Sequence, residues 1–367
     1  MTINRLIIVF CLIASGIQIP YLSIAQSSDT RNIKRSFQTA ENVTVEIDSK
    51  YGRIEIVPWN KDSVVIEAVT TIKTKSKEKL TKYFDNIEFD FSGNQNFVTA
   101  HTIFDKNRTP IGTGLVKGRE SLKISDGSIS IDYVVHLPNK AKLEITNKFG
   151  DIYLGDFLGE CRIDLSNGKL KANDLAGRLT LKLYFADASI NKLADANLDV
   201  NYGKVYLKDA QSIIYNGKSS NIDIGTIKNF SSNSLRDIIR ISEIGNLTGS
   251  GYFTNFKIQM LSKGIKLSTQ YGDLDIALVT SSFNEINIIS KSTDLRLNFA
   301  ADTKLNYDIT YMKCKTNLSR SFDLIKEQII NEKEGRVKIN GFMGKNRSDN
   351  PSVTVNAESG TLFFTAQ

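Results

Sequence analysis

The chain has 367 residues, of which 41% are hydrophobic and 24% are charged, a balance that excludes wholesale disorder and is typical of a folded globular protein. Its net charge of +7 is small for this length, and the basic residues are spread along the chain. Because the sequence has neither a concentrated basic patch nor a nucleic-acid-binding motif, we expect no nucleic acid among its partners.

Residues 1–25 have the layout of a cleaved signal peptide. A basic residue precedes an apolar run over residues 6–14, and Ser23 and Ala25 are the small residues expected before a cleavage site. The apolar run is too short and too interrupted to span a membrane comfortably, and no later stretch is apolar enough for a transmembrane helix. We therefore expect an exported protein that begins at Gln26 and has no transmembrane segment after signal cleavage.

The residues that follow divide into a polar segment and a strand-rich region. Residues 26–35 are polar, and we expect them to form a loose N-terminal segment. Residues 36–140 form an N-terminal β region by pattern, because apolar and polar side chains alternate in stretches such as residues 43–47 and 63–68. Alternation at every second position is the pattern of half-buried strands.

One stretch of the N-terminal β region has a helical pattern instead. Near residues 76–87, four apolar side chains recur at the spacing of one helix face: Leu80, Tyr83, Phe84 and Ile87. Ser76 precedes them, where its hydroxyl can cap the first turn. The pattern predicts one short helix that packs on the sheet.

Residues 141–367 are repetitive. The repeating element is an aromatic or polar residue, then a small turn residue, then an alternating strand, as in the sequence around Phe149. The small marker residues stand at positions 150, 168, 186, 203 and 220, so the successive differences in position are 18, 18, 17 and 17. Three further steps lead to Gly272, through two turns around Asp237 and Phe256 where the motif is blurred. A second strand lies between successive markers.

One two-strand unit cannot bury its own apolar face, whereas a stack of such units forms a continuous core. The sequence therefore predicts an all-β fold in which residues 141–367 form a β-solenoid-like stack of two-strand coils of about 17–18 residues. An antiparallel β-sandwich is the alternative, because strands separated by turns roughly every 8–12 residues also suit that fold. The near-constant step favours the stack, which the C-terminal strands would cap or extend.

Residue types that carry catalysis are sparse. The two histidines, His101 and His136, lack the spacing of metal ligands, and no nucleotide-, phosphate- or metal-binding motif is present. We therefore expect no catalytic residue, no metal ion and no cofactor. Five aspartates could project from neighbouring coils and suit glycoside cleavage, which keeps a carbohydrate-active enzyme as the least favoured alternative: Asp164, Asp187, Asp199, Asp209 and Asp223.

Four aromatic residues share the motif position directly before the small turn residue. They are Tyr51, Phe149, Tyr202 and Tyr271, and Phe185 is close to the same position. On a solenoid these side chains would line one edge. If buried, they would form a spine that sets the turns, which is the interpretation we favour. If exposed, they would form an aromatic edge able to stack on sugar rings, and this edge is the candidate ligand-binding site.

The mature chain has two cysteines, Cys161 and Cys314, which are far apart in sequence and form no paired motif. A buried thiol is the commoner fate of a cysteine in a β-strand. Pairing of the two in an oxidising compartment is the alternative, and the sequence leaves both open.

Residues 50–64 and 147–154 resemble a family of exported bacterial proteins known as putative adhesins, a domain of unknown function with a β-solenoid-like repeat. The resemblance implies a location in the periplasm or at the cell surface of a bacterium, and it brings no catalytic residue. We therefore expect an exported, non-enzymatic, adhesin-like or surface-binding protein of the cell envelope, with a glycan or an envelope protein as its partner. A structural or regulatory envelope scaffold is the alternative, and the oligomeric state stays open.

Overall fold

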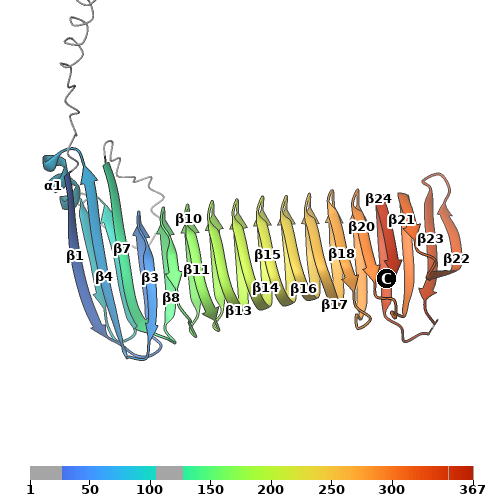
Figure 1. The fold of residues 1–367 in the computed structure, drawn as a ribbon, viewed down its shortest axis with the longest axis horizontal. Helices are drawn as coiled ribbons and strands as arrows, with labels where there is room; N and C mark the ends of the chain where they lie inside the picture. The colour runs from blue at the N-terminus through green and yellow to red at the C-terminus, as the bar shows by residue number, and fades with distance from the viewer. Residues whose placement is uncertain (1–26, 105–126, 346, 367) are drawn as a thin grey trace, which may run out of the picture.

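The computed structural model describes residues 27–104, 127–345 and 347–366, which form one long rod of β-strands (Figure 1). The predicted signal peptide, residues 1–25, lies outside these ranges. Within the described residues the rod contains 24 strands and one helix, so the predicted all-β fold class is confirmed. The first strands lie at one end of the rod and the last ones at the other, as the colours from blue to red show.

The rod has two faces, named here after their first coil strands. The β2 face begins with β2 (Thr44–Lys50), β8 (Lys142–Lys148), β10 (Cys161–Ser166) and β12 (Leu179–Tyr184). The β3 face begins with β3 (Ile54–Trp59), β9 (Ile152–Leu154) and β11 (Lys169–Leu175). Five long strands then bend from the β3 face to the β2 face: β13 (Asp187–Asn201), β14 (Lys204–Lys218), β15 (Asn221–Leu235), β16 (Ile238–Tyr252) and β17 (Asn255–Gln270). The stack continues with β18 (Asp273–Val279), β19 (Glu285–Lys291) and β20 (Asp294–Phe299).

Successive coils pair in parallel at the predicted offset. Leu170 pairs with Ile152 and Val205 pairs with Ala188, so each residue lies beside the one that stands a single repeat earlier in the chain. Apolar side chains at equivalent positions face the interior and are almost completely buried, so that each coil covers the core of the next. Parallel pairing at a constant offset confirms the solenoid and is incompatible with an antiparallel sandwich in this region.

At the N-terminal end, further strands and a helix close the rod. β1 (Ser27–Gln38), β4 (Ser63–Thr74) and β7 (Gly127–Pro138) extend the β3 face, while β5 (Ile87–Gly93) and β6 (Phe97–Phe104) extend the β2 face. The predicted short helix is present as α1 (Lys77–Asp85).

The helix α1 has the predicted cap and the predicted buried side. The Ser76 hydroxyl accepts a hydrogen bond from the backbone N–H of Lys79 at 3.5 Å, and Leu80 and Phe84 are buried. The helix packs against β4, β1 and β5, so it covers the end of the core. No helix among the described residues is long and apolar enough to cross a membrane.

Of residues 26–35, which we expected to be loose, the described residues 27–35 instead form most of β1. This strand pairs with β4 along its whole length, from Ser27 opposite Thr74 to Gln38 opposite Ser63. It is the edge strand of the β3 face and most of its side chains are exposed. Backbone hydrogen bonds hold this strand, and of its apolar side chains Ile33 and Phe37 pack partly against the core, so its sequence carries no sustained alternating pattern.

At the C-terminal end, the last strand in sequence is not the last in space. β24 (Ser352–Ala366) lies between β19 and β21 (Leu305–Leu318) on the β2 face and between β20 and β21 on the β3 face. Beyond β21, β23 (Arg336–Met343) and β22 (Phe322–Asn331) continue the β2 face alone, as antiparallel strands. The final strand therefore inserts into the stack, and the β22–β23 pair forms the end of the rod.

Candidate functional site

The chain crosses from the β2 face to the β3 face along one side of the rod, here called the turn edge. At each of these crossings one residue has a left-handed backbone, with φ between 48° and 66°. Six of these residues are aromatic and six are not: Tyr51, Phe149, Asn167, Phe185, Tyr202, Ser219, Arg236, Phe253, Tyr271, Ser292, Lys313 and Ser359. The six aromatic residues include all four predicted site residues, and we call them the aromatic edge.

The marker residue that follows each left-handed residue lies against the preceding coil. A Cβ atom on Gly150 would lie 1.8 Å from the carbonyl oxygen of Gly52, and one on Gly272 would lie 2.0 Å from that of Thr254. Such approaches leave no space for a side chain without a shift of the backbone. This close approach explains the small residues of the repeat, and the aromatic neighbour is left to point outward.

The left-handed turn itself does not require an aromatic residue. A non-glycine residue in this conformation costs about 1–2 kcal/mol, and Asn is among the residues that tolerate it best. Asn167, Ser219, Arg236 and Ser292 form the same turn in other coils of the same stack. Because polar side chains occupy this position in other coils, turn geometry alone does not account for the aromatic residues.

The six rings of the aromatic edge form three stacked pairs. Their centroids are 5.6 Å apart in Tyr51–Phe149, 4.9 Å in Phe185–Tyr202 and 5.0 Å in Phe253–Tyr271, with interplanar angles of 12–18°. Neighbouring strands are about 4.8 Å apart, so each ring rests on the ring of the next coil. Two more tyrosines, Tyr184 and Tyr252, contact the second and third pairs edge-on.

These rings are not a buried spine, so the interpretation that we favoured from the sequence is wrong. Phe149 is 50% exposed, Phe185 52%, Tyr202 41% and Tyr271 39%. The left-handed residue lies on the outer side of the corner, and its small neighbour is the one that meets the preceding coil. The ligand-binding role of Tyr51, Phe149, Tyr202 and Tyr271 stays a prediction, but all four lie at the surface of one side of the rod.

The first two ring pairs are separated by a gap at Asn167, here called the notch. Phe149 and Phe185 belong to coils two steps apart, which places their rings about 10 Å from each other. A flat ring held midway would therefore lie about 5 Å from each, the spacing of the stacked pairs themselves. Two surface hollows of about 490 and 440 Å³ share the notch residue Asn167 and the neighbouring Asp151.

Polar side chains flank the notch on the β3 face. Oδ1 of Asp151 accepts a hydrogen bond from the backbone N–H of Lys169 at 2.9 Å, and Oδ1 of Asp187 accepts one from that of Lys204 at 3.0 Å. These bonds hold both carboxylates in place at the two ring pairs. The hollows are lined by Asp151 and Asp187 together with the aromatic rings.

On the β2 face a third hollow, of about 410 Å³, lies beside the same coils. It is lined by Asn147, Asp164, Lys182 and Tyr184 among others. Within the described residues, Oδ1 of Asn147 and Oδ1 of Asp164 are buried and accept no hydrogen bond. Asn147 is completely buried and faces the interior of the rod, so of these two residues only Asp164 has a side chain on the outer side of the strand.

The five aspartates considered for glycoside cleavage divide between the two faces of the rod. Asp164 and Asp199 lie on the β2 face, in coils separated by Lys182. The other three, Asp187, Asp209 and Asp223, lie on the β3 face. Asp164 and Asp199 line the same hollow of about 410 Å³ but stand two coils, about 10 Å, apart, which is wider than the spacing of the two acids in a retaining glycosidase.

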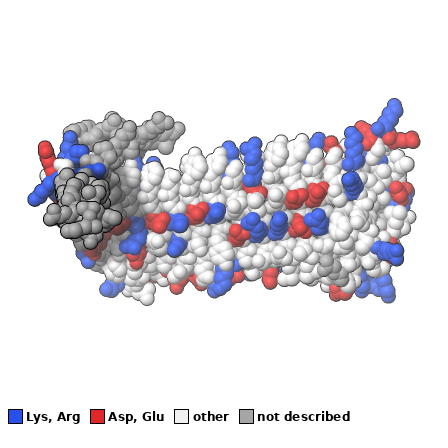
Figure 2. All heavy atoms as spheres, turned by 45° about the horizontal axis from the view of Figure 1, so that its top comes forward, with Lys and Arg blue, Asp and Glu red and all other residues white. Residues whose placement is uncertain are grey.

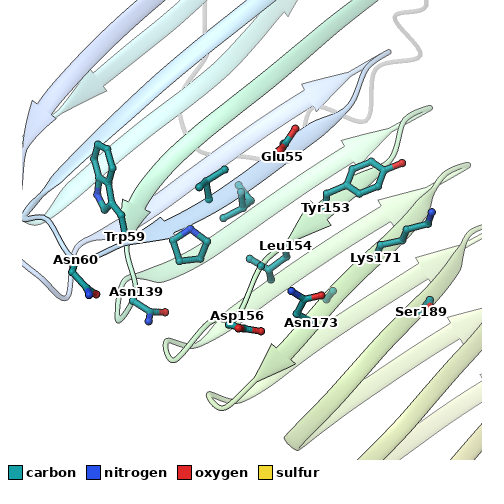
Figure 3. Close-up of a pocket in the computed structure, with 15 residues that line it drawn as sticks. Glu55, Trp59, Asn60, Asn139, Tyr153, Leu154, Asp156, Lys171, Asn173 and Ser189 are labelled. Atoms are coloured by element: carbon teal, nitrogen blue, oxygen red, sulfur yellow. The ribbon is translucent and has the colours of Figure 1, made fainter.

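A larger hollow, of about 870 Å³, lies elsewhere, between β3 and the first coils of the β3 face (Figure 3). Trp59 stands at its rim, but its ring already stacks on His136 at 5.0 Å and has Lys61 Nζ 4.8 Å from its centre. Its Nε1–H donates to the carbonyl oxygen of Ser63 at 2.9 Å. Because the indole is engaged by the protein itself, this hollow offers less aromatic surface to a ligand than the notch does.

A buried polar cluster at the middle of the rod was not foreseen from the sequence. The carboxylate of Asp237 accepts hydrogen bonds from the Tyr215 hydroxyl at 3.0 Å, the Ser234 hydroxyl at 2.7 Å and the backbone N–H of Ser220 at 2.8 Å. Burial raises the pKa of Asp237, and those hydrogen bonds oppose the rise. Asp237 and Thr254 are the markers of the two blurred turns, so a polar residue there replaces the usual small one.

The two mature cysteines are free thiols. Cys161 is buried and Cys314 is partly buried. Burial raises the pKa of the Cys161 thiol to about 12, so this group stays protonated and unreactive at neutral pH.

Charged side chains of both signs are interspersed along the rod (Figure 2). Ion pairs link neighbouring coils, as between Arg240 and Asp223 at 3.0 Å and between Arg296 and Asp275 at 3.3 Å. Such exposed pairs contribute little stability each. Their effect is to keep the face shown in Figure 2 free of a large patch of single charge.

No protein-family model and no curated protein match this chain. Among solved structures, a putative cell adhesion protein from Clostridium sporogenes is 11% identical, with 94% of this chain and 100% of that chain covered and a TM-score of 0.19. A putative adhesin from Bacteroides fragilis is 9% identical, with 92% and 97% covered and a TM-score of 0.26. Identities and TM-scores this low support no argument about function.

Proposed function

We propose that this chain is an exported, non-enzymatic surface-binding protein of the bacterial envelope that binds saccharide chains at its aromatic edge, centred on the notch. The observation that carries the proposal is that exposed aromatic rings occupy left-handed turn positions where other coils use Ser, Asn or Arg. Exposed aromatic residues are costly in solution and are enriched at binding sites.

The notch has the shape for one ring of a sugar. Phe149 and Phe185 face it from coils two steps apart, and a ring between them would meet an aromatic face on each side. Asn167 forms the floor, and its exposed amide is able to donate and accept hydrogen bonds.

The walls of the notch supply the polar contacts that a sugar needs. Asp151 and Asp187 on one side, and Asp164 on the other, are acceptors for hydroxyl groups. A sugar ring offers both an apolar face and a rim of hydroxyl groups, so this combination of rings and acceptors matches it. The two later coils of the edge, with Phe253 and Tyr271, would contact the same polymer further along the rod.

The test is a glycan-array screen of the chain from Gln26 onward, followed by calorimetric titration of the best ligand. The informative variants are Phe149→Ser and Phe185→Ser, because serine is the residue that the chain itself uses at positions 219 and 292. We expect each to weaken binding at least tenfold. The matched control is Phe253→Ser, which makes the same change in the same turn away from the notch and should weaken binding less.

A second variant, Asn167→Phe, fills the notch with a residue type that other turns of the edge already carry. We expect it to fold normally and to lose binding. Binding that persists in Asn167→Phe would place the ligand elsewhere on the rod. If the unaltered chain binds no glycan at all, the envelope scaffold becomes the better interpretation, and its protein partners would be sought by cross-linking.

A further inference from the structure

The two ends of the rod are closed in different ways. At the N-terminal end α1 packs against β4, β1 and β5 and buries Leu80 and Phe84 there. At the C-terminal end the β22–β23 pair extends the β2 face beyond the last strand of the β3 face. Within the described residues no helix or strand covers the inner side of this extension.

The core ends part of the way along β22. Phe322 is buried and packs on Phe299, Tyr307 and Phe364, with ring centroids 5.7–6.4 Å apart. Beyond it, four large aliphatic side chains of the same strand are about half exposed or more: Leu324 at 53%, Ile325 at 57%, Ile329 at 64% and Ile330 at 48%. We call these four residues the end patch.

The register of β22 explains how these side chains gather. Leu324 is opposite Gly341 and Ile329 is opposite Val337, so both continue the inner side of the β2 face. The register shifts at Ile325 and at Ile330, and such bulges bring an extra side chain to one face. Leu324 and Ile329 therefore continue the core side of the sheet, and Ile325 and Ile330 are the extra residues of the two bulges beside them.

We propose that the end patch is the contact surface for a second copy of this chain, so that two rods meet end to end about a twofold axis. This inference concerns assembly and is independent of the proposed saccharide binding. Half-exposed Leu and Ile side chains of this number present roughly 400 Å² of apolar surface, as large as the largest patch of a typical monomer. Stable interfaces bury about 800 Å² per partner, so the patch would form their apolar centre.

The same patch on both copies is the arrangement that the rest of the molecule favours. The described part of the N-terminal end exposes charged side chains of α1 and β1, such as Lys77 and Lys34, where the end patch would have to pack. A head-to-tail contact is therefore poorly matched. The two bulges in β22 also disfavour simple extension of the sheet by edge pairing, so we expect packing of side chains.

Charge supports a protein partner over a lipid surface. Glu327 lies between the two halves of the end patch and is opposite Ile339, on the same inner side of the strand. Placing this carboxylate in a bilayer would be costly. Against a second copy this carboxylate can stay at the hydrated rim of the contact, because protein interfaces have a polar rim around their apolar centre.

The experiment measures the mass and the length of the chain from Gln26 onward, by light scattering after gel filtration and by small-angle scattering over a concentration series. We expect a dimer at micromolar concentration whose maximum dimension is nearly twice that of the monomer. The variants Ile325→Lys and Ile329→Lys should weaken dimerisation more than tenfold. Ile329→Ser removes the apolar side chain without adding charge and should weaken it in the same direction.

The matched control is Ile289→Lys. Ile289 is 58% exposed, close to Ile325 at 57%, but it lies in β19 on the side of the rod. This variant should dimerise like the unaltered chain. The proposal is overturned by a chain that stays monomeric up to high concentration, by dimers that tolerate both lysine variants, by a dimer no longer than the monomer, or by open-ended polymers. Flotation of a monomeric chain with anionic lipid vesicles, lost in Ile329→Lys, would assign the patch to a membrane instead.

Discussion

Two stretches of the turn edge, residues 149–202 and residues 219–254, share one backbone conformation but have opposite side-chain chemistry. In the first, three of the four left-handed residues carry rings that point outward, above marker residues that are glycine or alanine. In the second, Ser219 and Arg236 are the outer residues of the first two turns, and the markers are polar and buried. The same turn thus presents either a ring at its outer, left-handed position or a polar group at its inner, marker position.

The polar markers join neighbouring coils through the interior. The backbone N–H of Gly203 donates to the Ser220 hydroxyl at 3.3 Å, that of Ser220 to the Asp237 carboxylate at 2.8 Å, and that of Asp237 to the Thr254 hydroxyl at 3.4 Å. Each marker therefore binds the next one along the rod. The residue at the inner position of the turn therefore holds neighbouring coils together, whereas the residue at the outer position forms the surface of the rod.

The largest expected effect comes from placing a side chain where the first stretch has none. Gly150→Ala would bring a Cβ atom 1.8 Å from the carbonyl oxygen of Gly52, so the backbone of two coils must shift. We expect a loss of more than about 2 kcal/mol in the free energy of unfolding, measured by urea denaturation. Gly155→Ala is the control, because its nearest contact is a Pro58 side-chain atom at 3.3 Å. Equal stability of the two variants would contradict the crowding argument.

The same turns show how much of the fold could be predicted from the sequence. The near-constant step between markers predicted the stack and placed blurred turns around Asp237 and Phe256. In the structure the first marker is Asp237 and the second is Thr254, two residues before Phe256. The predicted aromatic positions also lie along one side of the rod, as expected. Repeats are readable because every coil restates the same local constraint.

What the sequence did not show depends on contacts between distant segments. β1 pairs with β4, and β24 inserts next to β21, yet neither strand carries a local signal of its partner. The exposure of the rings was not predicted because the two adjacent residues of each turn were not considered separately. The small marker residue faces the preceding coil, and the aromatic residue before it faces outward. A clue was present, since only a residue pressed against backbone needs to be glycine, which leaves its neighbour outside.

An intermediate effect concerns the pH dependence of the second stretch. Burial raises the pKa of Asp237 above its ordinary value of 3.8, so the folded chain holds this proton more tightly than the unfolded chain does. Stability is then highest at acidic pH with respect to this group, and it falls as the pH rises through the raised pKa. We expect Asp237→Asn, which cannot ionise, to remove this part of the fall.

The measurement is a series of thermal denaturation curves between acidic and neutral pH. Asp223→Asn is the matched control, because Asp223 is a half-exposed aspartate of the neighbouring coil that pairs with Arg240 at the surface. The control should keep the decline in stability that the unaltered chain shows. A decline that is the same in Asp237→Asn and in the unaltered chain would assign the pH dependence to other groups.

The smallest expected effect tests whether the turn is indifferent to its outer residue. Phe253→Ser removes one ring of the third stacked pair, whose contact with Tyr271 is worth about 1 kcal/mol or less. Ser219→Phe is the reverse change in the same type of turn, and it should alter stability by a similarly small amount. Both are measured by urea denaturation beside Gly150→Ala. If Phe253→Ser instead destabilised the rod as strongly as Gly150→Ala, the rings would be structural supports of the turn. The rings would then no longer mark a binding surface, because that role requires a backbone that needs no ring at this position.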